Sequence, residues 1–161
     1  MFETEITQNR FLLGYCQNLV SDLPDERLTE QPLPNVNHPA WILGHLANTF
    51  DVVSGMLGGE KKLDALWNEK FGRTSKCAAA RSDYPSKEEL LGKLLERAQA
   101  FHIMAAGLSQ EKLNEPNPNP RMKDAMPRTE DLVAFLLTGH FATHLGQLSA
   151  WRRMIGLPPL F

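Results

Sequence analysis

TEDLVAFLLTGHFATHLGQLSAWRRMI, residues 129–155, contains no proline over 27 residues and repeats apolar side chains at helical spacing. Glu130 and Asp131 stand in its first turn, and Arg152 and Arg153 stand in its last turn. These charges suit the dipole of a helix. The run predicts one continuous helix, about 40 Å long at 1.5 Å per residue. A helix of that length favours a bundle of helices.

Three further segments have the same apolar period, residues 4–21, 37–58 and 86–108. In the second of them Asn37 can cap the helix and Pro39 suits the first turn. The last of them opens with Ser-Lys-Glu-Glu, which is typical of a capping box at the start of a helix. A short extra helix is expected at residues 67–71, and nothing in the sequence reads convincingly as a strand. Four amphipathic helices predict an all-α fold, most simply a four-helix bundle.

Two long connections join these segments. Residues 59–85 are long enough to travel the full length of a helix, so the second and third helices need not be antiparallel neighbours. Residues 110–128 contain the proline-rich stretch Pro116-Asn117-Pro118-Asn119-Pro120. That composition predicts a loop, which either covers a pocket as a lid or only joins two helices.

Length and charge narrow the function classes. A chain of 161 residues predicts a single domain over 1–161. Seventeen basic and 19 acidic residues give a net charge of −2, which argues against nucleic acid and anionic membranes as partners. No apolar run reaches 18 residues, and the first ten residues lack the basic start of a signal peptide. Two cysteines, Cys16 and Cys77, without a C-x-x-C motif fit a reducing compartment, so we expect a cytoplasmic protein.

The chemical signal lies in the histidines. His140 and His144 are one helical turn apart, on the inward stripe where apolar residues are expected. An unpaired buried polar group costs roughly 1–3 kcal/mol, so two buried imidazoles need partners for their ring nitrogens. The i, i+4 spacing lets two such nitrogens reach one ion at about 2.0–2.1 Å. His45 lies on the inward stripe of residues 37–58 and is a candidate third ligand.

Other interpretations of the histidines stay open. A single inward histidine is more often a hydrogen-bonded core residue than a ligand, and an i, i+4 pair arises by chance in some sequences. His102 is expected to be a core or surface residue rather than a fourth ligand. His38 is either a helix cap or surface residue, or an acid–base group at the mouth of the pocket, which makes it the one candidate catalytic residue. The motifs of zincins, di-iron bundles, serine hydrolases, P-loops and Rossmann folds are absent.

Two stretches carry a family resemblance. Residues 37–46, NHPAWILGHL, contain Trp-x-x-x-His, and residues 139–148, GHFATHLGQL, contain His-x-x-x-His-x-Gly-Gln. Together they resemble the motifs of the DinB-like (damage-inducible) metalloprotein superfamily, and the resemblance extends over the whole chain in length and helix order. It implies an up-down-down-up four-helix bundle and, as in many members, a homodimer. The family name refers to induction by DNA damage and does not imply DNA binding.

The resemblance also implies a site. One divalent ion, for which nickel, zinc, iron and manganese are candidates, would be held by His45, His140 and His144. Three neutral imidazoles leave the ion its full charge and an open position, where water is acidified or a thiol binds as thiolate. Some relatives use bacillithiol, mycothiol or glutathione in this way. We therefore expect a metal-dependent thiol S-transferase or hydrolase with a small-molecule substrate, the alternatives being a non-catalytic metal-binding protein or a metal-free helical interaction protein.

Several nearby residues are candidates for supporting roles. Metal-bound histidines usually donate their second N–H to an acceptor. The candidate polar partners are Gln147, Thr49, Asn48 and Thr143. Asp51 lies off the stripe of His45 and is expected to be solvated.

Glycine and large apolar residues also flank the histidines. Gly44 and Gly139 each precede a candidate ligand, which suggests a close helix crossing near the site. Trp41, Trp151 and Met56 are expected to line the core or the pocket.

Overall fold

The computed structural model describes residues 1–160, and these form helices joined by loops. The helices are α1 (Glu3–Ser21), α2 (Pro39–Met56), α3 (Ala65–Phe71), α4 (Lys87–Gly107), α5 (Gln110–Asn114), α6 (Thr129–Phe135) and α7 (Phe141–Met154). Short 3-10 turns cover Asp25–Thr29 and Arg81–Asp83. Apart from an isolated bridge between Pro116 and Arg128, no strand pairing occurs within residues 1–160. The all-α prediction is confirmed.

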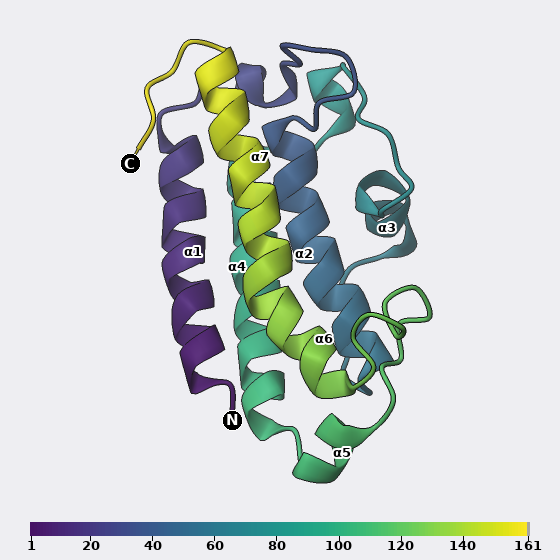
Figure 1. The fold of residues 1–161 in the computed structure, drawn as a ribbon. Helices are drawn as coiled ribbons and strands as arrows, with labels where there is room; N and C mark the ends of the chain where they lie inside the picture. Colours follow the sequence, from purple (N-terminus) through teal and green to yellow (C-terminus); the bar gives the residue numbers. More distant parts are fainter. Residues whose placement is uncertain (161) are drawn as a thin grey trace.

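The long helices lie side by side (Figure 1). α1 and α7 run from the bottom to the top of the view, whereas α2 and α4 run from the top to the bottom. α2 packs against α4, α1 packs against α7, and α2 and α7 also touch. α3 lies outside this group, against α2, and the connection from α2 to α4 passes along that side of the molecule.

The ends of the helices follow the local sequence signals. Ser86 accepts a hydrogen bond from the backbone N–H of Glu89, as the capping box predicts. The short helix expected at 67–71 forms as part of α3, where Asp64 caps the first turn. The cap of α2 differs from the expectation: His38, and not Asn37, is the N-cap residue.

The helix predicted over 129–155 runs without a break to Met154, but it is not α-helical throughout. A five-residue π-helix, Leu136–His140, separates α6 from α7. Within this segment the carbonyl of Leu137 accepts a hydrogen bond from the side chain of Asn9 on α1, far away in the sequence (2.7 Å). The pattern of residues 129–155 contains no trace of that contact.

The core lies between the four long helices and is apolar. Its largest fully buried apolar side chains include Trp151, Phe71, Phe101, Phe141, Leu19, Leu23 and Leu28. Trp41 is buried as well, whereas Met56 is 40% exposed and lies outside the core that we expected for it. None of the described helices combines the length and the apolar character that crossing a membrane requires.

The connection 110–128 begins with the helix α5 and is then an ordered loop. Asn117 organises it: its side chain donates to the Met126 carbonyl (2.7 Å) and accepts from the N–H of Asn119 (2.8 Å). The N–H of Thr129 donates to the Glu115 carbonyl (2.9 Å), which ties the loop to the start of α6. These contacts link the stretch with three prolines to its own far end and to α6.

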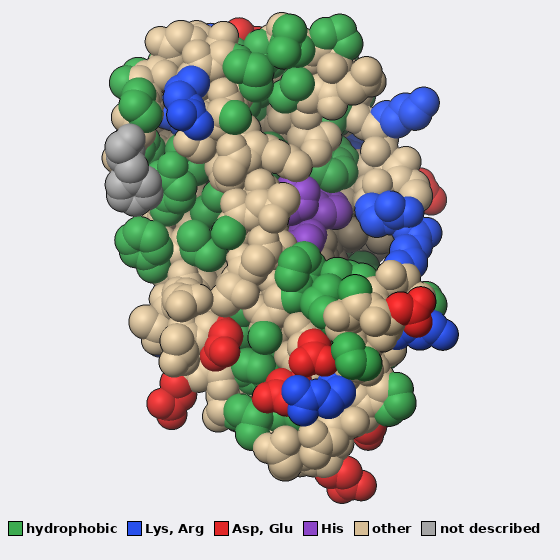
Figure 2. All heavy atoms as spheres, in the orientation of Figure 1, with side chains coloured by type: hydrophobic (Ala, Val, Ile, Leu, Met, Phe, Trp, Pro, Cys, Tyr) green, Lys and Arg blue, Asp and Glu red, His purple; other side chains and the backbone are tan. Residues whose placement is uncertain are grey.

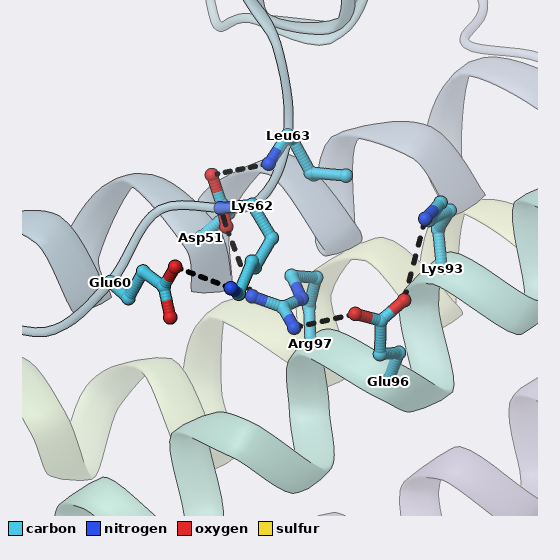
Figure 3. Close-up of polar contacts among 7 residues, drawn as sticks. All are labelled: Asp51, Glu60, Lys62, Leu63, Lys93, Glu96 and Arg97. Atoms are coloured by element: carbon cyan, nitrogen blue, oxygen red, sulfur yellow. Dashed lines mark hydrogen bonds and ion pairs between the residues drawn. The ribbon is translucent and has the colours of Figure 1, made fainter.

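Asp51 on α2 is buried, so the expectation that it is solvated is wrong (Figure 3). Its Oδ1 accepts from the N–H of Lys62 (2.7 Å) and from Arg97 Nη1 (3.3 Å), and its Oδ2 accepts from the N–H of Leu63 (3.2 Å). Arg97 also pairs with Glu96 (2.7 Å) on α4. Asp51 therefore fastens the connection after α2 to this helix through two N–H groups, and its ion pair with Arg97 joins α2 to α4.

Candidate metal centre

His45, His140 and His144 meet in one cluster. His45 projects from α2, His140 ends the π-helix, and His144 lies one turn further along, in α7. Their ring centroids are 4.7 Å apart for the pairs that include His144 and 5.5 Å apart for His45 and His140. One ring nitrogen of each histidine lies within 4.8 Å of those of the other two. The structure thus brings together the three residues that the sequence singled out.

His45 is oriented by the segment that follows α3. Its Nδ1–H donates to the carbonyl of Phe71 (2.8 Å). Since a carbonyl only accepts, Nδ1 carries the proton and Nε2 of the neutral ring has a free lone pair. Gly44 permits this contact, because a Cβ at Gly44 would lie 2.2 Å from the Phe71 ring. A side chain, and not the helix crossing that we expected, occupies the space beside this glycine.

His144 is oriented by two amide side chains. Its Nδ1 lies 3.2 Å from Gln147 Oε1, and the same oxygen accepts from Asn37 Nδ2 (3.2 Å). The oxygen of Gln147 therefore faces the ring, Nδ1–H donates to it, and Nε2 of His144 is left with a free lone pair. Of the four polar residues proposed as partners of the histidines, Gln147 takes that position.

The other three polar residues have different partners. Thr49 Oγ1 donates to its own helix, at the carbonyl of His45 (2.9 Å), and lies 3.5 Å from His45 Nε2. Asn48 bonds to Asn68 (3.1 Å), and Thr143 bonds to the carbonyl of Gly139 (2.8 Å). They stabilise the surrounding helices and do not orient an imidazole through its Nδ1.

Burial keeps the three rings neutral. It lowers the pKa of His45, and for His140 it acts together with the neighbouring His144 and His45 to lower the pKa to about 3. Burial and the proximity of His45 lower the pKa of His144 to about 4. A neutral imidazole is the form that binds a metal, so protons do not compete for these nitrogens near neutral pH.

Aromatic side chains surround the cluster. The Trp41 ring stacks on His45, with centroids 4.5 Å apart and planes 9° apart, and the Phe135 ring lies 5.9 Å from His140. Trp41 is fixed in turn by its Nε1–H, which donates to Ser75 Oγ (2.8 Å). His45 and His144 are buried and His140 is half-buried. Histidine side chains are visible at the surface in Figure 2, beside a hollow in the middle of this face.

The remaining histidines lie outside the cluster. His38 is buried, its Nδ1 accepts from the N–H of Trp41 (3.2 Å), and its Nε2 lies 3.0 Å from the carbonyl of Ala78. Both ring nitrogens are engaged, which supports the capping role and argues against acid–base chemistry. His102 is a buried core residue that pairs with Asn9 through its Nε2 (2.8 Å).

Sequence reasoning missed two contributors to the site. Phe71 acts through its backbone carbonyl, which no side-chain pattern reveals. Asn37 was interpreted as a helix cap, although its place in the same motif as His45 was a signal that it lies close to the site. Its Oδ1 lies 3.6 Å from the thiol of Cys77, which orients the amide so that Nδ2 faces Gln147.

The residues of the cluster fit a divalent cation. Both Nε2 atoms with free lone pairs, those of His45 and His144, can only accept, and no hydrogen bond joins the ring of His140 to another group among residues 1–160. Three neutral imidazoles that face one another with lone pairs offer one another no hydrogen-bond donor, and a cation can accept all three lone pairs. The tetrahedral arrangement of such a site needs neighbouring nitrogens roughly 3.4 Å apart at bond lengths of about 2.0–2.1 Å, so binding would draw the rings slightly closer.

Comparisons with known proteins agree with this geometry. A conserved protein from Enterococcus faecalis of known crystal structure superposes with a TM-score of 0.75, over 96% of this chain and 96% of that chain, at 14% sequence identity. That likeness shows the fold. No curated protein matches the sequence. Residues 12–148 match the family profile of the DinB superfamily. The chain therefore belongs to the DinB superfamily.

Proposed function

We propose that the chain is a metal-dependent enzyme in which His45, His140 and His144 hold one divalent ion. Superfamily membership supports the proposal, because DinB proteins typically bind a metal. The convergence of three neutral imidazoles on one point supports it independently. The reaction class is the transfer of a small nucleophile, a low-molecular-weight thiol or water, to an electrophilic small molecule.

The observation that carries the enzymatic interpretation is the open position of the cluster. Structural zinc sites are closed by four protein ligands, whereas catalytic sites have three protein ligands and one exchangeable position. Within residues 1–160 the cluster that could hold a metal contains three side chains, and Figure 2 shows histidine side chains beside a hollow at the surface. A divalent ion bound here supplies Lewis acidity, which favours the deprotonated form of a water or thiol.

The surrounding residues would orient and shield the reactants. Phe71 and Gln147 keep the Nδ1 protons of His45 and His144 directed away from the centre. Trp41 and Phe135 form apolar walls on two sides of the imidazoles. Low polarity around a charged centre strengthens its electrostatic effect on a bound nucleophile.

The ligand set limits the choice of metal. Three imidazoles without a carboxylate or thiolate suit nickel, zinc and iron, and disfavour magnesium and calcium, which prefer oxygen. Manganese remains in the proposal as the first-row ion with the lowest affinity for such a site. Metal availability in the cell then decides among them.

The proposal includes an architecture. We place α1, α2, α4 and α6–α7 as the four members of an up-down-down-up bundle that forms one domain over residues 1–161; the helix directions in Figure 1 support this. A homodimer in the cytoplasm, without a nucleic acid partner, stays a prediction from the sequence. Size-exclusion chromatography with light scattering tests the dimer.

The test uses protein purified without a His tag and loaded in turn with nickel, zinc, iron(II) and manganese. Each form is assayed with several cellular thiols and with water alone against model electrophiles such as alkyl halides, epoxides and esters. We expect metal-dependent turnover that is lost in His140→Ala and retained in His38→Asn, which keeps a capping side chain on α2. One bound ion per chain with no turnover in any combination would favour a non-catalytic metal protein.

A further inference from the structure

Two buried polar side chains outside the cluster are unused by the proposed function. Asn9 on α1 is fully buried and His102 on α4 is 6% exposed. His102 Nε2–H donates to Asn9 Oδ1 (2.8 Å), and Asn9 Nδ2 donates to the carbonyl of Leu137 (2.7 Å). The two bonds form a short chain that links α4 through α1 to the π-helix.

The π-helix is the element that carries His140. Leu136–His140 form a π-helix, in which hydrogen bonds span five residues instead of four. α7 begins at Phe141, whose N–H donates to the carbonyl of Thr138. Where the spacing changes, one carbonyl has no backbone N–H inside the helix. The carbonyl of the fully buried Leu137 lies within this segment, and it is the one that meets a donor from outside, Asn9.

We propose that Asn9 and His102 are positioning residues, which hold the π-helix and thereby set the direction of the His140 ring. The inference rests on the proposed metal site, because the direction of the His140 ring decides whether all three histidines can bind the ion. Asn9 acts directly on the helix. His102 acts through Asn9, because its donation to Oδ1 fixes the amide with Nδ2 toward Leu137.

A change from π to α spacing would shift the segment before or the segment after the π-helix by one residue, which is a rotation of about 100° at 3.6 residues per turn. The segment after the π-helix, α7, is anchored by hydrogen bonds. Trp151 Nε1–H donates to the carbonyl of Glu30 (2.7 Å), and Arg152 Nη1 donates to the carbonyl of Leu19 (2.8 Å). The rotation would therefore fall on the segment that ends in His140, and this ring would leave the cluster while His45 and His144 stay.

The first experiment separates the two bonds of the chain. In Asn9→Asp the carboxylate still accepts from His102 but has no N–H for the Leu137 carbonyl. His102→Leu removes the donor that orients Asn9, and His102→Gln restores an N–H donor at that position. We expect the His140 ring to leave its position in Asn9→Asp and in His102→Leu, and to keep it in His102→Gln.

Cobalt(II) is the probe of the complete site, since its visible absorption reports coordination number. We expect wild type and His102→Gln to give the same spectrum and the same affinity within about threefold. Asn9→Asp and His102→Leu should bind cobalt(II) at least tenfold more weakly, with a changed spectrum that matches the one of His140→Ala. An unchanged spectrum and affinity in folded His102→Leu and Asn9→Asp would overturn the proposal.

A measurement without metal keeps this inference separate from the proposed function. In metal-free protein, NMR scalar couplings across hydrogen bonds report directly whether the N–H groups after Leu136 bond five or four residues back. We expect π spacing in wild type and His102→Gln, and α spacing in Asn9→Asp and His102→Leu. His102→Leu is the milder change, and it provides the test if Asn9→Asp does not fold. If wild type binds no cobalt(II), the proposed function fails, and the couplings still decide whether Asn9 and His102 hold the π-helix.

Discussion

Two of the buried polar residues of α2, His45 and Asp51, differ in how their charges and hydrogen bonds are satisfied. Asp51 pairs with an opposite charge, Arg97, and with the N–H groups of Lys62 and Leu63 (Figure 3). His45, less than two turns earlier, faces two groups of its own kind, His140 and His144. Both arrangements place polar atoms where the helix otherwise packs apolar side chains.

The difference separates a structural cluster from a functional one. The Asp51 carboxylate has donors on both oxygens from within the chain, so it contributes to stability by fixing a connection. His45 and His144 donate their Nδ1–H groups to Phe71 and Gln147, outside the cluster, and direct their Nε2 lone pairs inward. A cluster that contains only acceptors is completed by a cation, whereas a cluster of opposite charges is complete by itself.

Removing a member of the Asp51 cluster should have the largest effect on stability. We expect Asp51→Ala to destabilise the fold by about 3 kcal/mol, because it leaves Arg97 buried without this carboxylate and two N–H groups without an acceptor. Urea unfolding monitored by circular dichroism measures this change. Glu60→Ala is the control, since that exposed side chain pairs only with Lys62 at the edge of the cluster. The metal affinity of folded Asp51→Ala should match that of wild type, and a parallel loss of affinity would contradict the separation of the two clusters.

Removing a member of the histidine cluster should have the opposite profile. His140→Ala should weaken metal binding at least a hundredfold, which is about 2.7 kcal/mol. The free energy of unfolding of the metal-free protein should change by less than about 1 kcal/mol, because the ring is only partly buried and its removal breaks no hydrogen bond. Isothermal titration calorimetry and urea unfolding of the same preparation test both halves. A large loss of metal-free stability would show that the imidazoles support the fold.

Gly44→Ala should affect both stability and metal affinity. The new methyl group would meet the Phe71 ring at 2.2 Å, so this ring and its carbonyl must move away from α2. We expect a loss of about 2 kcal/mol of stability from overpacking and a weaker metal site, because the Phe71 carbonyl no longer orients His45. Gly14→Ala is the matched control in a helix, since nothing lies near its added methyl group. Unchanged metal affinity in Gly44→Ala would contradict the role of the Phe71 carbonyl.

Acidification should destabilise the metal-free protein. Burial lowers the pKa of all five histidines on folding, so below about pH 6.5 the unfolded chain binds more protons than the folded one. The histidines make their whole contribution to stability above that pH. As the pH falls toward 4, the free energy of unfolding decreases by about 1.4 kcal/mol per pH unit for each extra proton that the unfolded chain binds.

Urea midpoints between pH 7.5 and 4.5 measure the effect of pH. His140→Ala should flatten this profile, because one of the histidines with a strongly lowered pKa is gone. His102→Gln removes a histidine outside the cluster and gives the comparison. Equal stability at pH 7 and pH 5 would contradict the assignment of neutral rings to the cluster.

The smallest effect should come from Gln147. Gln147→Leu removes the acceptor for His144 Nδ1–H, and partners of this kind change metal affinity by about 10- to 100-fold. We expect the low end, about tenfold, because Gln147 is exposed and water replaces it in part. Gln147→Glu restores an acceptor at the same position and should recover the affinity. Equal affinities for Gln147→Leu and wild type would show that Gln147 does not orient the ring.

Local signals predicted the helices well. Ser86 and Pro39 lie at the starts that their types suggest, since capping and proline preferences act over a few residues. The meeting of His45 with His140 and His144 followed from the stripe on each helix together with the family resemblance.

What the sequence did not predict depends on contacts between distant segments. The π-helix has a hydrogen bond from Asn9, which lies 128 positions before Leu137. The burial of Asp51 depends on Arg97, 46 positions later, and on backbone N–H groups that have no signature in the sequence. Periodicity places a residue on a face of its helix but does not show which partner faces it.

The most direct test of the central claim is anomalous diffraction from crystals of the tag-free protein loaded with zinc or nickel. We predict one anomalous peak per chain, at about 2.0–2.1 Å from Nε2 of His45 and of His144 and from one ring nitrogen of His140. A metal-loaded crystal without a peak there, or with the ion bound to Nδ1 after loss of the Phe71 and Gln147 contacts, would contradict it.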